Sequence, residues 1–258
     1  MSDIVLLEVS DRIATVTLNR PDVRNALSSA VLRLLPERLT EADARDDVDV
    51  IVLTGTDPAF CAGLDLSELA SGGLLDGSGA DGTQNAAGVR GPFPPLTKPL
   101  IGAVNGVAVT GGLELALNCD FLVASERAKF GDTHTRVGVM PGWGLSVLLP
   151  QAVGVRRARE MSFTGNFVDA RTALAWGLVN HVVPHEELIP TVRALASDIA
   201  GNFQPGVRAL RSTYAAVSAE ADNWGIEASA AAAWRRGTFD RSHVAQAKDA
   251  IIERGRGQ

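Results

Sequence analysis

The first part of the chain alternates between apolar and polar positions in a way that predicts a β-hairpin. Residues 4–9 are strand-like, residues 10–12 are turn-like, and apolar side chains alternate with threonines over residues 14–18. Asn19-Arg20-Pro21 then ends the second strand, because proline cannot donate to a β-ladder.

Helical periodicity follows the hairpin. Leu32, Leu35 and Leu39 recur at helical spacing behind Ser28, whose hydroxyl is suited to cap a helix N-terminus. Pro36 lies inside this pattern, so we expect the helix to kink or break there.

The middle of the chain has the strand–helix–strand order of a layered α/β protein. Residues 48–53 form a short apolar strand, and residues 100–109, 111–118 and 121–124 follow the pattern of a strand, a helix and a strand. From about residue 143 onward the pattern is mostly helical. The candidate helices cover residues 155–163, 170–176, 186–200, 206–218, 224–236 and 243–254.

Residues 71–92 differ from the rest of the chain in composition. They are rich in glycine and small polar residues and have few apolar anchors, which predicts a mobile loop. The loop is either a solvated insertion or a lid over a site formed by the segments on its two sides.

Composition excludes several classes of protein. The chain has 258 residues, of which 46% are hydrophobic and 21% charged, values typical of a globular protein. Its net charge of −6 disfavours a nucleic-acid partner. No apolar stretch approaches the length of a membrane span, and Cys61 and Cys119 form no disulfide framework. We therefore expect a cytoplasmic protein that binds neither nucleic acid nor membrane.

Familiar catalytic motifs are absent from the sequence. It contains no G-x-S-x-G elbow, no H-E-x-x-H and no P-loop, and the glycines at 106–112 lack the dinucleotide-binding order. Cys61 has no base beside it in sequence, so we interpret it as a buried structural thiol rather than a nucleophile.

Two segments carry stronger signals, residues 60–66 and residues 105–116. In the second, an apolar strand runs into a helix whose first turn contains Gly111, Gly112 and Glu114. Backbone N–H groups in a first helical turn have no partner within the helix, and small residues let a ligand approach them. Such N–H groups would stabilise an oxyanion. The alternative is a tight structural junction with a helix-capping glutamate.

Several motifs, taken in order, resemble the enoyl-CoA hydratase/isomerase (crotonase) family. The resemblance spans most of residues 4–200 and weakens over the C-terminal helices. The motifs that carry it are Asn19-Arg20-Pro21, Asn25-Ala26-Leu27, residues 60–66, residues 98–106, residues 111–116, residues 138–142, and Thr164-Gly165 with Gly177-Leu178-Val179.

This resemblance implies an α/β fold, a crotonase-type spiral of β-β-α repeats. Residues 1–200 would form the core, and residues 201–258 a helical region through which trimers, often paired as hexamers, assemble. The substrate would be an acyl group carried as a coenzyme A thioester, with no permanently bound cofactor and no metal.

The resemblance also implies roles for particular residues. The thioester carbonyl would lie in an oxyanion hole made by the N–H groups of Ala62 and Gly111. Ala62, Gly63, Leu64 and Asp65 would line the bound coenzyme A. Arg24 is a candidate to bind the coenzyme A phosphates.

The sequence departs from the family at one catalytic position. Hydratases that it resembles use two glutamates, one at the position of Glu114 and one in the loop after Phe130-Gly131, where this chain has His134. Histidine can donate or accept a proton near neutral pH. Asp132 is a candidate to orient the His134 ring or favour its charged form.

The hypothesis with most support is an enoyl-CoA hydratase-like lyase in which Glu114 is the principal acid/base and His134 assists. Two alternatives remain open. One is a different reaction on the same fold, as in a hydrolase, decarboxylase or isomerase, although the isomerases depend on the missing glutamate. The other is a non-catalytic protein that binds acyl-CoA.

Overall fold

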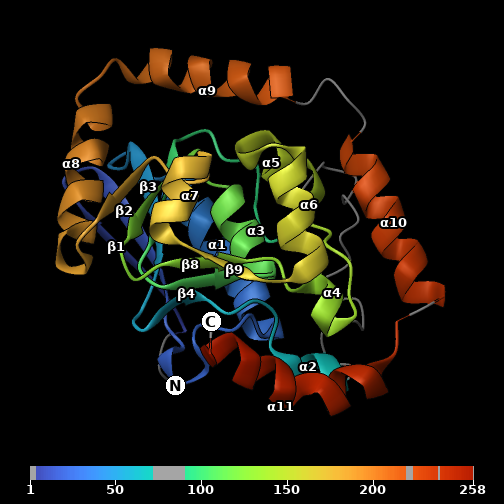
Figure 1. Cartoon of the computed structure of the whole chain (residues 1–258). Helices are drawn as coiled ribbons and strands as arrows, with labels where there is room; N and C mark the ends of the chain where they lie inside the picture. Colours follow the sequence, from blue (N-terminus) through green and yellow to red (C-terminus); the bar gives the residue numbers. More distant parts are fainter. Residues whose placement is uncertain (1–3, 72–90, 219–222, 238, 258) are drawn as a thin grey trace.

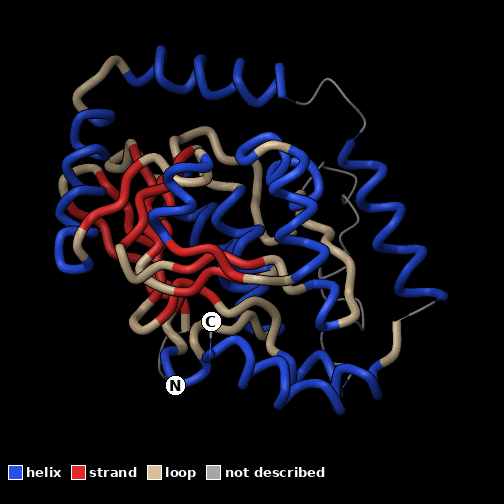
Figure 2. Tube along the Cα trace, in the orientation of Figure 1, coloured by secondary structure: helices blue, strands red, loops and turns tan. Residues whose placement is uncertain are grey.

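A computed structural model describes residues 4–71, 91–218, 223–237 and 239–257. Its strands form two sheets, one of six strands and one of four, surrounded by helices (Figures 1 and 2). The six-stranded sheet consists, in spatial order, of β1 (Val5–Ser10), β2 (Ile13–Leu18), β3 (Val50–Gly55), β5 (Leu100–Val104), β7 (Phe121–Ser125) and β10 (His181–Val183). The four-stranded sheet consists of β4 (Ala59–Cys61), β6 (Val107–Val109), β8 (Lys129–Gly131) and β9 (Phe167–Asp169). The predicted α/β class is confirmed.

The predicted hairpin is present at the start of the larger sheet. β1 and β2 pair antiparallel, with Val5 opposite Leu18, and the remaining neighbours in this sheet pair parallel. Asp11 and Arg12 make the turn with φ angles of 52° and 64°.

The predicted strand at residues 100–109 is two strands in two different sheets. β5 belongs to the six-stranded sheet and β6 to the four-stranded one, and the chain turns between them at Asn105-Gly106. A Cβ atom on Gly106 would lie 2.4 Å from the carbonyl oxygen of Pro58, so this corner needs glycine. Asn105-Gly106 interrupts the apolar run and is a dipeptide typical of turns, so the corner had a local signal that the one-strand prediction passed over.

The helices predicted in the second half of the chain are present, with ends shifted by a few residues. The three-residue strands β8, β9 and β10 were not predicted, because three positions are too few to show alternation. The helices α2, α4 and α5 were not among the predicted helices either. The helices are η1 (Pro21–Val23), α1 (Ser29–Ala44), α2 (Leu66–Ser71), α3 (Gly111–Leu117), α4 (His134–Val137), α5 (Leu145–Val153), α6 (Val155–Thr164), α7 (Ala170–Trp176), η2 (His185–Glu187), α8 (Leu188–Ala200), α9 (Gln204–Ser218), α10 (Asn223–Gly237) and α11 (Arg241–Gly257).

Helix α1 begins as predicted but continues through Pro36. The Ser28 hydroxyl accepts a hydrogen bond from Val31 N at 3.3 Å, which confirms the N-cap. Of the kink or break expected at Pro36, the break is wrong, because the helix runs on to Ala44, and the kink stays a prediction. Leu35 and Leu39 on its buried face pack into the main core, and this packing offsets the hydrogen bond that proline cannot donate.

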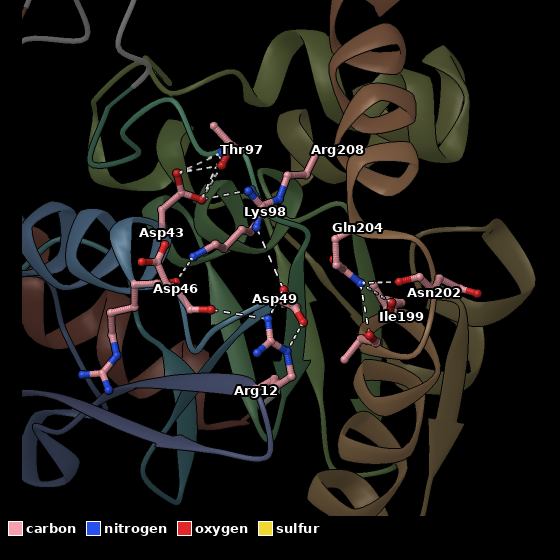
Figure 3. A network of polar contacts seen from close by, with 12 residues as sticks. Arg12, Asp43, Asp46, Asp49, Thr97, Lys98, Ile199, Asn202, Gln204 and Arg208 are labelled. Atoms are coloured by element: carbon pink, nitrogen blue, oxygen red, sulfur yellow. Dashed lines mark hydrogen bonds and ion pairs between the residues drawn. The ribbon is translucent and has the colours of Figure 1, made fainter.

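A polar network fixes the C-terminal end of α1 beside the start of β5 (Figure 3). The buried Lys98 ammonium donates to the carbonyl oxygens of Ala42 and Arg45 at 3.2 and 2.6 Å. Asp49, also buried, accepts from Arg12 Nη2 at 2.8 Å and lies 4.0 Å from Arg208 of α9. Burial lowers the pKa of Lys98. Since Lys98 and Arg12 donate to acceptors within the scaffold, we interpret the network as structural.

The C-terminal helices run around the outside of the core (Figure 1). α8 packs against the six-stranded sheet, α10 against α5, and α11 against α2 and α4. Most of the glycine-rich stretch at residues 71–92 lies outside the described residues. Among the helices that the structure describes, none is long and apolar enough to cross a membrane.

Candidate active site

The strand–helix junction at α3 packs directly against the 60–66 segment, as the sequence predicted. Thr110, at φ 54°, donates its N–H to Gly131 O at 3.0 Å and turns the chain into the helix. A Cβ on Gly112 would lie 2.1 Å from Cys61 O, so only glycine allows this approach. Gly63, with φ +83°, makes the matching turn, and a Cβ there would lie 2.9 Å from Val109 O.

The backbone of the 60–66 segment corrects one predicted role. The N–H of Ala62 donates to Arg24 O at 3.0 Å, so it is already bonded within the protein and does not face a ligand. Ala62 was therefore the wrong choice for the oxyanion hole, although it does line a cavity.

Leu64 is the better-placed donor. Leu27 bridges to this segment by donating to Gly63 O at 2.8 Å and accepting from Asp65 N at 3.0 Å. Because successive N–H groups of an extended strand point to opposite sides, the N–H of Leu64 faces away from Leu27. Leu64 and Gly111 line the same small cavity, and Gly111 is the first residue of α3, where the N–H has no partner within the helix.

Glu114 lies in the first turn of α3, with its side chain buried in the same cavity. Its Oε1 atom accepts hydrogen bonds from the backbone N–H groups of Trp143 at 2.7 Å and Gly142 at 3.3 Å. These bonds fix the carboxylate and leave Oε2 facing His134 Nε2, 3.4 Å away.

His134 is the first residue of α4 and is 5% exposed, so its ring is buried rather than solvated. Its Nδ1 atom lies 2.6 Å from Asp132 Oδ1, and its backbone N–H donates to the same oxygen at 3.2 Å. Burial by itself lowers the pKa of His134, but the hydrogen bonds and charges of Asp132 and Glu114 outweigh it and raise that pKa to about 10. The two carboxylates therefore favour the imidazolium form of the ring.

The pKa of Asp132 shifts in the opposite direction from that of His134. Burial by itself raises the pKa of this carboxyl group. The hydrogen bond and the charge of His134 lower it by more, so the pKa of Asp132 is lowered overall. Asp132, His134 and Glu114 thus form a buried row in which a cation lies between two carboxylates. Sequence alone placed His134 in a loop, and it did not predict that the ring is buried between two acids.

Two adjoining cavities meet at Leu64. The larger has a volume of about 360 Å³, and its lining includes Arg24, Ala62, Asp65 and Lys248. The smaller, of about 60 Å³, contains Gly111, Glu114 and His134. Since Leu64 and Val139 line both cavities, a ligand in the larger one could reach the acid/base residues in the smaller one.

Asp65 and Arg24 have different surroundings at the larger cavity. Asp65 forms an ion pair with Arg20 at 3.1 Å and accepts from Ser67 N at 3.1 Å, so its carboxylate supports the loop and the start of α2. Arg24 lines the cavity with its backbone in the left-handed region.

Residues distant in sequence complete the site. The N–H groups of Gly142 and Trp143 hold Glu114, Lys248 of α11 reaches the larger cavity, and Trp234 and Arg235 of α10 line the smaller one. The Pro-Gly turn at 141–142 was a local signal for the first pair. The amphipathic pattern of α10 and α11 carries no signal for the cavities that these helices reach.

Two other groups that resemble nucleophilic sites are structural. Cys61 is fully buried, and burial raises the pKa of its thiol to about 12. Ser125 Oγ lies 3.0 Å from His185 Nδ1, and His185 Nε2 lies 2.9 Å from Asp57 Oδ2. Ser125 has no exposed surface, so a substrate cannot reach its hydroxyl.

Comparison with known proteins agrees with this geometry. The family model described as "Enoyl-CoA hydratase/isomerase" matches residues 8–256. The chain belongs to this family. Its α/β fold is the crotonase-type fold that the sequence motifs implied.

Named relatives and solved structures carry the same description. The chain is 40% identical over 203 residues to a probable peroxisomal enoyl-CoA hydratase of Arabidopsis thaliana, covering 79% of this chain and 75% of that protein. It is 36% identical over 205 residues to a short-chain-enoyl-CoA hydratase of Clostridium acetobutylicum, covering 79% and 78%. The enoyl-CoA hydratase structure from Mycobacterium smegmatis has a TM-score of 0.81 and 48% identity, covering 92% of this chain and all 100% of that one. This family member is accordingly an enzyme of the hydratase/lyase type.

Proposed function

We propose that the protein adds water to short 2-enoyl-CoA thioesters, and removes it in the reverse direction, with Glu114 and His134 as the acid/base pair. The observation that carries this proposal is the position of Glu114 Oε2, 3.4 Å from His134 Nε2, in the cavity that Gly111 and Leu64 also line.

The first element of the mechanism is the oxyanion hole. The N–H groups of Gly111 and Leu64 donate to the thioester oxygen, and both bonds strengthen as negative charge develops there in the enolate. Fixed backbone donors need no rearrangement during the reaction, which is why they stabilise the transition state more than the ground state.

The acid/base step uses the two side chains in opposite senses. Glu114 Oε2 accepts a proton from water as the water oxygen bonds to C3, and the electrons of the C2–C3 double bond move toward the thioester. The His134 imidazolium then donates the Nε2 proton to C2. Glu114 is left protonated and His134 neutral, and transfer of the proton from Oε2 to Nε2 restores the pair. Their proximity supports that transfer.

Asp132 is the positioning residue of this pair. Its hydrogen bond to Nδ1 fixes the His134 ring and directs Nε2 toward Glu114. It also compensates the positive charge of the ring, which burial would otherwise remove. The Asp132–His134 unit thereby replaces the second glutamate of the family.

The larger cavity is the proposed site for coenzyme A, which enters as part of the substrate and is not a resident cofactor. Arg24 and Lys248 are the candidates for the phosphates, because both carry positive charge at its lining. Leu64, at the junction of the cavities, would lie beside the thioester.

Residues 201–258 are the proposed oligomerisation region. Phe203 and, on α9, Leu210 and Tyr214 are 77%, 61% and 73% exposed, which is unusual for side chains of this size. A second copy of the chain would cover them, and we propose a homotrimer that can pair into a hexamer. The two free cysteines also support a reducing, cytoplasmic location.

The direct test is turnover of crotonyl-CoA, followed by the loss of absorbance of the conjugated enoyl thioester. The wild-type protein should hydrate it, and Glu114→Gln should reduce kcat by orders of magnitude while retaining binding of the thioester. Unchanged turnover in folded Glu114→Gln would contradict the proposed chemistry.

A further inference from the structure

The smaller cavity extends from the catalytic pair to helix α10. At the α10 side it is lined by Ala231, Trp234 and Arg235. Trp234 is fixed in place, because its Nε1–H donates to Gly138 O at 2.9 Å and its own carbonyl oxygen accepts from Phe239 N at 3.0 Å. The cavity is thus lined both by the proposed acid/base pair and by a fixed side chain of α10.

The proposed hydration involves only some of the charged residues that line this cavity. Among the described residues, the ionisable ones that line it are Glu114, His134 and Arg235. Glu114 faces His134, and Asp132 behind the ring balances the remaining positive charge. The proposed hydration therefore uses Glu114 and His134 but gives no role to the guanidinium of Arg235.

We infer that Arg235 recognises an acidic group at the end of the acyl chain, so that the preferred substrate is a short 2-enoyl-CoA thioester bearing a terminal carboxylate. This inference rests on the proposed function and adds the chemical class of the acyl group to it.

The composition of the cavity supports this substrate. Trp143, Trp234, Phe239 and Met140 supply apolar walls, which limit access of water and strengthen a charge–charge contact. A guanidinium carries five N–H donors in a planar fork, so Arg235 can keep its contacts within the protein and still bind a carboxylate.

The size of the cavity agrees with a short acyl group, whereas the net charge of the protein opposes an acidic one unless a local cation compensates it. The cavity volume of about 60 Å³ favours a short acyl group over a long fatty chain. The protein has a net charge of −6, which disfavours an additional negative charge on the ligand. A cation inside the cavity is what an acidic acyl group needs in such a protein.

The experiment compares two five-carbon substrates, glutaconyl-CoA, which ends in a carboxylate, and trans-2-pentenoyl-CoA, which ends in a methyl group. The ratio of their kcat/KM values is measured for the wild-type protein and for Arg235→Met. Arg236→Met is the matched control, because Arg236 is the exposed neighbour on the same helix and does not line the cavity. Binding of the saturated pair glutaryl-CoA and pentanoyl-CoA is measured in parallel by calorimetry.

We expect the wild-type protein to prefer glutaconyl-CoA, and Arg235→Met to lower the kcat/KM ratio by tenfold or more, the effect typical of one charge-assisted contact. Arg236→Met should leave the ratio unchanged, and glutaryl-CoA should bind the wild type more tightly than pentanoyl-CoA. Turnover of pentenoyl-CoA without preference for the carboxylate, or an unchanged ratio in Arg235→Met, would overturn this inference alone. If neither enoyl substrate turns over, the proposed hydration fails, and equal binding of the saturated pair would then overturn the carboxylate subsite as well.

Discussion

Glu114 Oε2 lies 3.4 Å from His134 Nε2, and both side chains line the smaller cavity. Glu114 comes from the first turn of α3, and His134 begins α4. Each is held from behind, Glu114 by the N–H groups of Gly142 and Trp143 and His134 by Asp132. Because both side chains are hydrogen-bonded to groups of the scaffold, the scaffold determines the relative position of the two reactive atoms.

The charge of His134 makes the stability of the protein depend on pH. Its pKa is raised to about 10 in the folded protein, against a reference value of 6.5. A raised folded-state pKa contributes stability that is fully present below about 6.5 and is lost as pH rises toward about 10. Urea unfolding of wild type should therefore show a steeper loss of stability between these pH values than unfolding of His134→Gln. Parallel pH profiles for the two proteins would show that His134 is not an imidazolium.

The oxyanion hole depends on the backbone at Gly111. A Cβ there would lie 3.0 Å from Trp143 Cζ3 and 3.4 Å from Leu27 Cδ1, so a branched side chain must push these side chains aside or shift the backbone and its N–H. Gly111→Val should lower kcat/KM on crotonyl-CoA by about 100-fold or more, the cost of losing one such donor. Gly201→Ala is the control, because a Cβ at that position meets no atom closer than 3.5 Å. A folded Gly111→Val protein with wild-type turnover would remove Gly111 from the mechanism.

Sequence predicted those parts of the molecule in which the signal is local. The β1–β2 hairpin, the Ser28 cap and the junction containing Gly111 and Glu114 follow from patterns a few residues long. The oxyanion donor in the 60–66 segment did not, because neighbouring N–H groups of an extended chain point in opposite directions and only the pairing with Leu27 determines which one is available.

The burial of His134 and the position of Arg235 were not predicted, because both depend on how helices pack together. The burial of His134 depends on residues from several helices, and the contribution of Arg235 to the cavity depends on how α10 packs. Neither is encoded in the spacing of nearby residues.

The Lys98 network should contribute to stability without taking part in catalysis. Lys98→Met removes the ammonium group that donates to the carbonyl oxygens of Ala42 and Arg45. Both oxygens, at the end of α1, then lose this hydrogen-bond donor. We expect the free energy of unfolding to fall by about 1–3 kcal/mol, measured by urea denaturation, with KM for crotonyl-CoA unchanged. A variant as stable as wild type would show that these hydrogen bonds are energetically neutral.

Assembly should depend on the apolar face of α9. Leu210 and Tyr214 lie one helical turn apart and are both exposed. Replacing both by aspartate should convert the proposed trimer or hexamer to monomers of 27.1 kDa in sedimentation, whereas Ser212→Asp, on the other side of the helix, should leave the assembly intact. A wild-type protein that sediments as a monomer would contradict the proposal directly.

The central claim, that Glu114 and His134 act as one acid/base unit, is tested most directly by a double-mutant cycle on kcat for crotonyl-CoA. Residues that act as a unit have non-additive effects, because losing either one already disables the step. We predict that Glu114→Gln and His134→Gln each lower kcat by about 1000-fold or more, and that the double variant is no slower than the slower single variant, with thioester binding retained throughout. A double variant whose loss equals the product of the two single losses, or a single variant with wild-type kcat, would contradict the account.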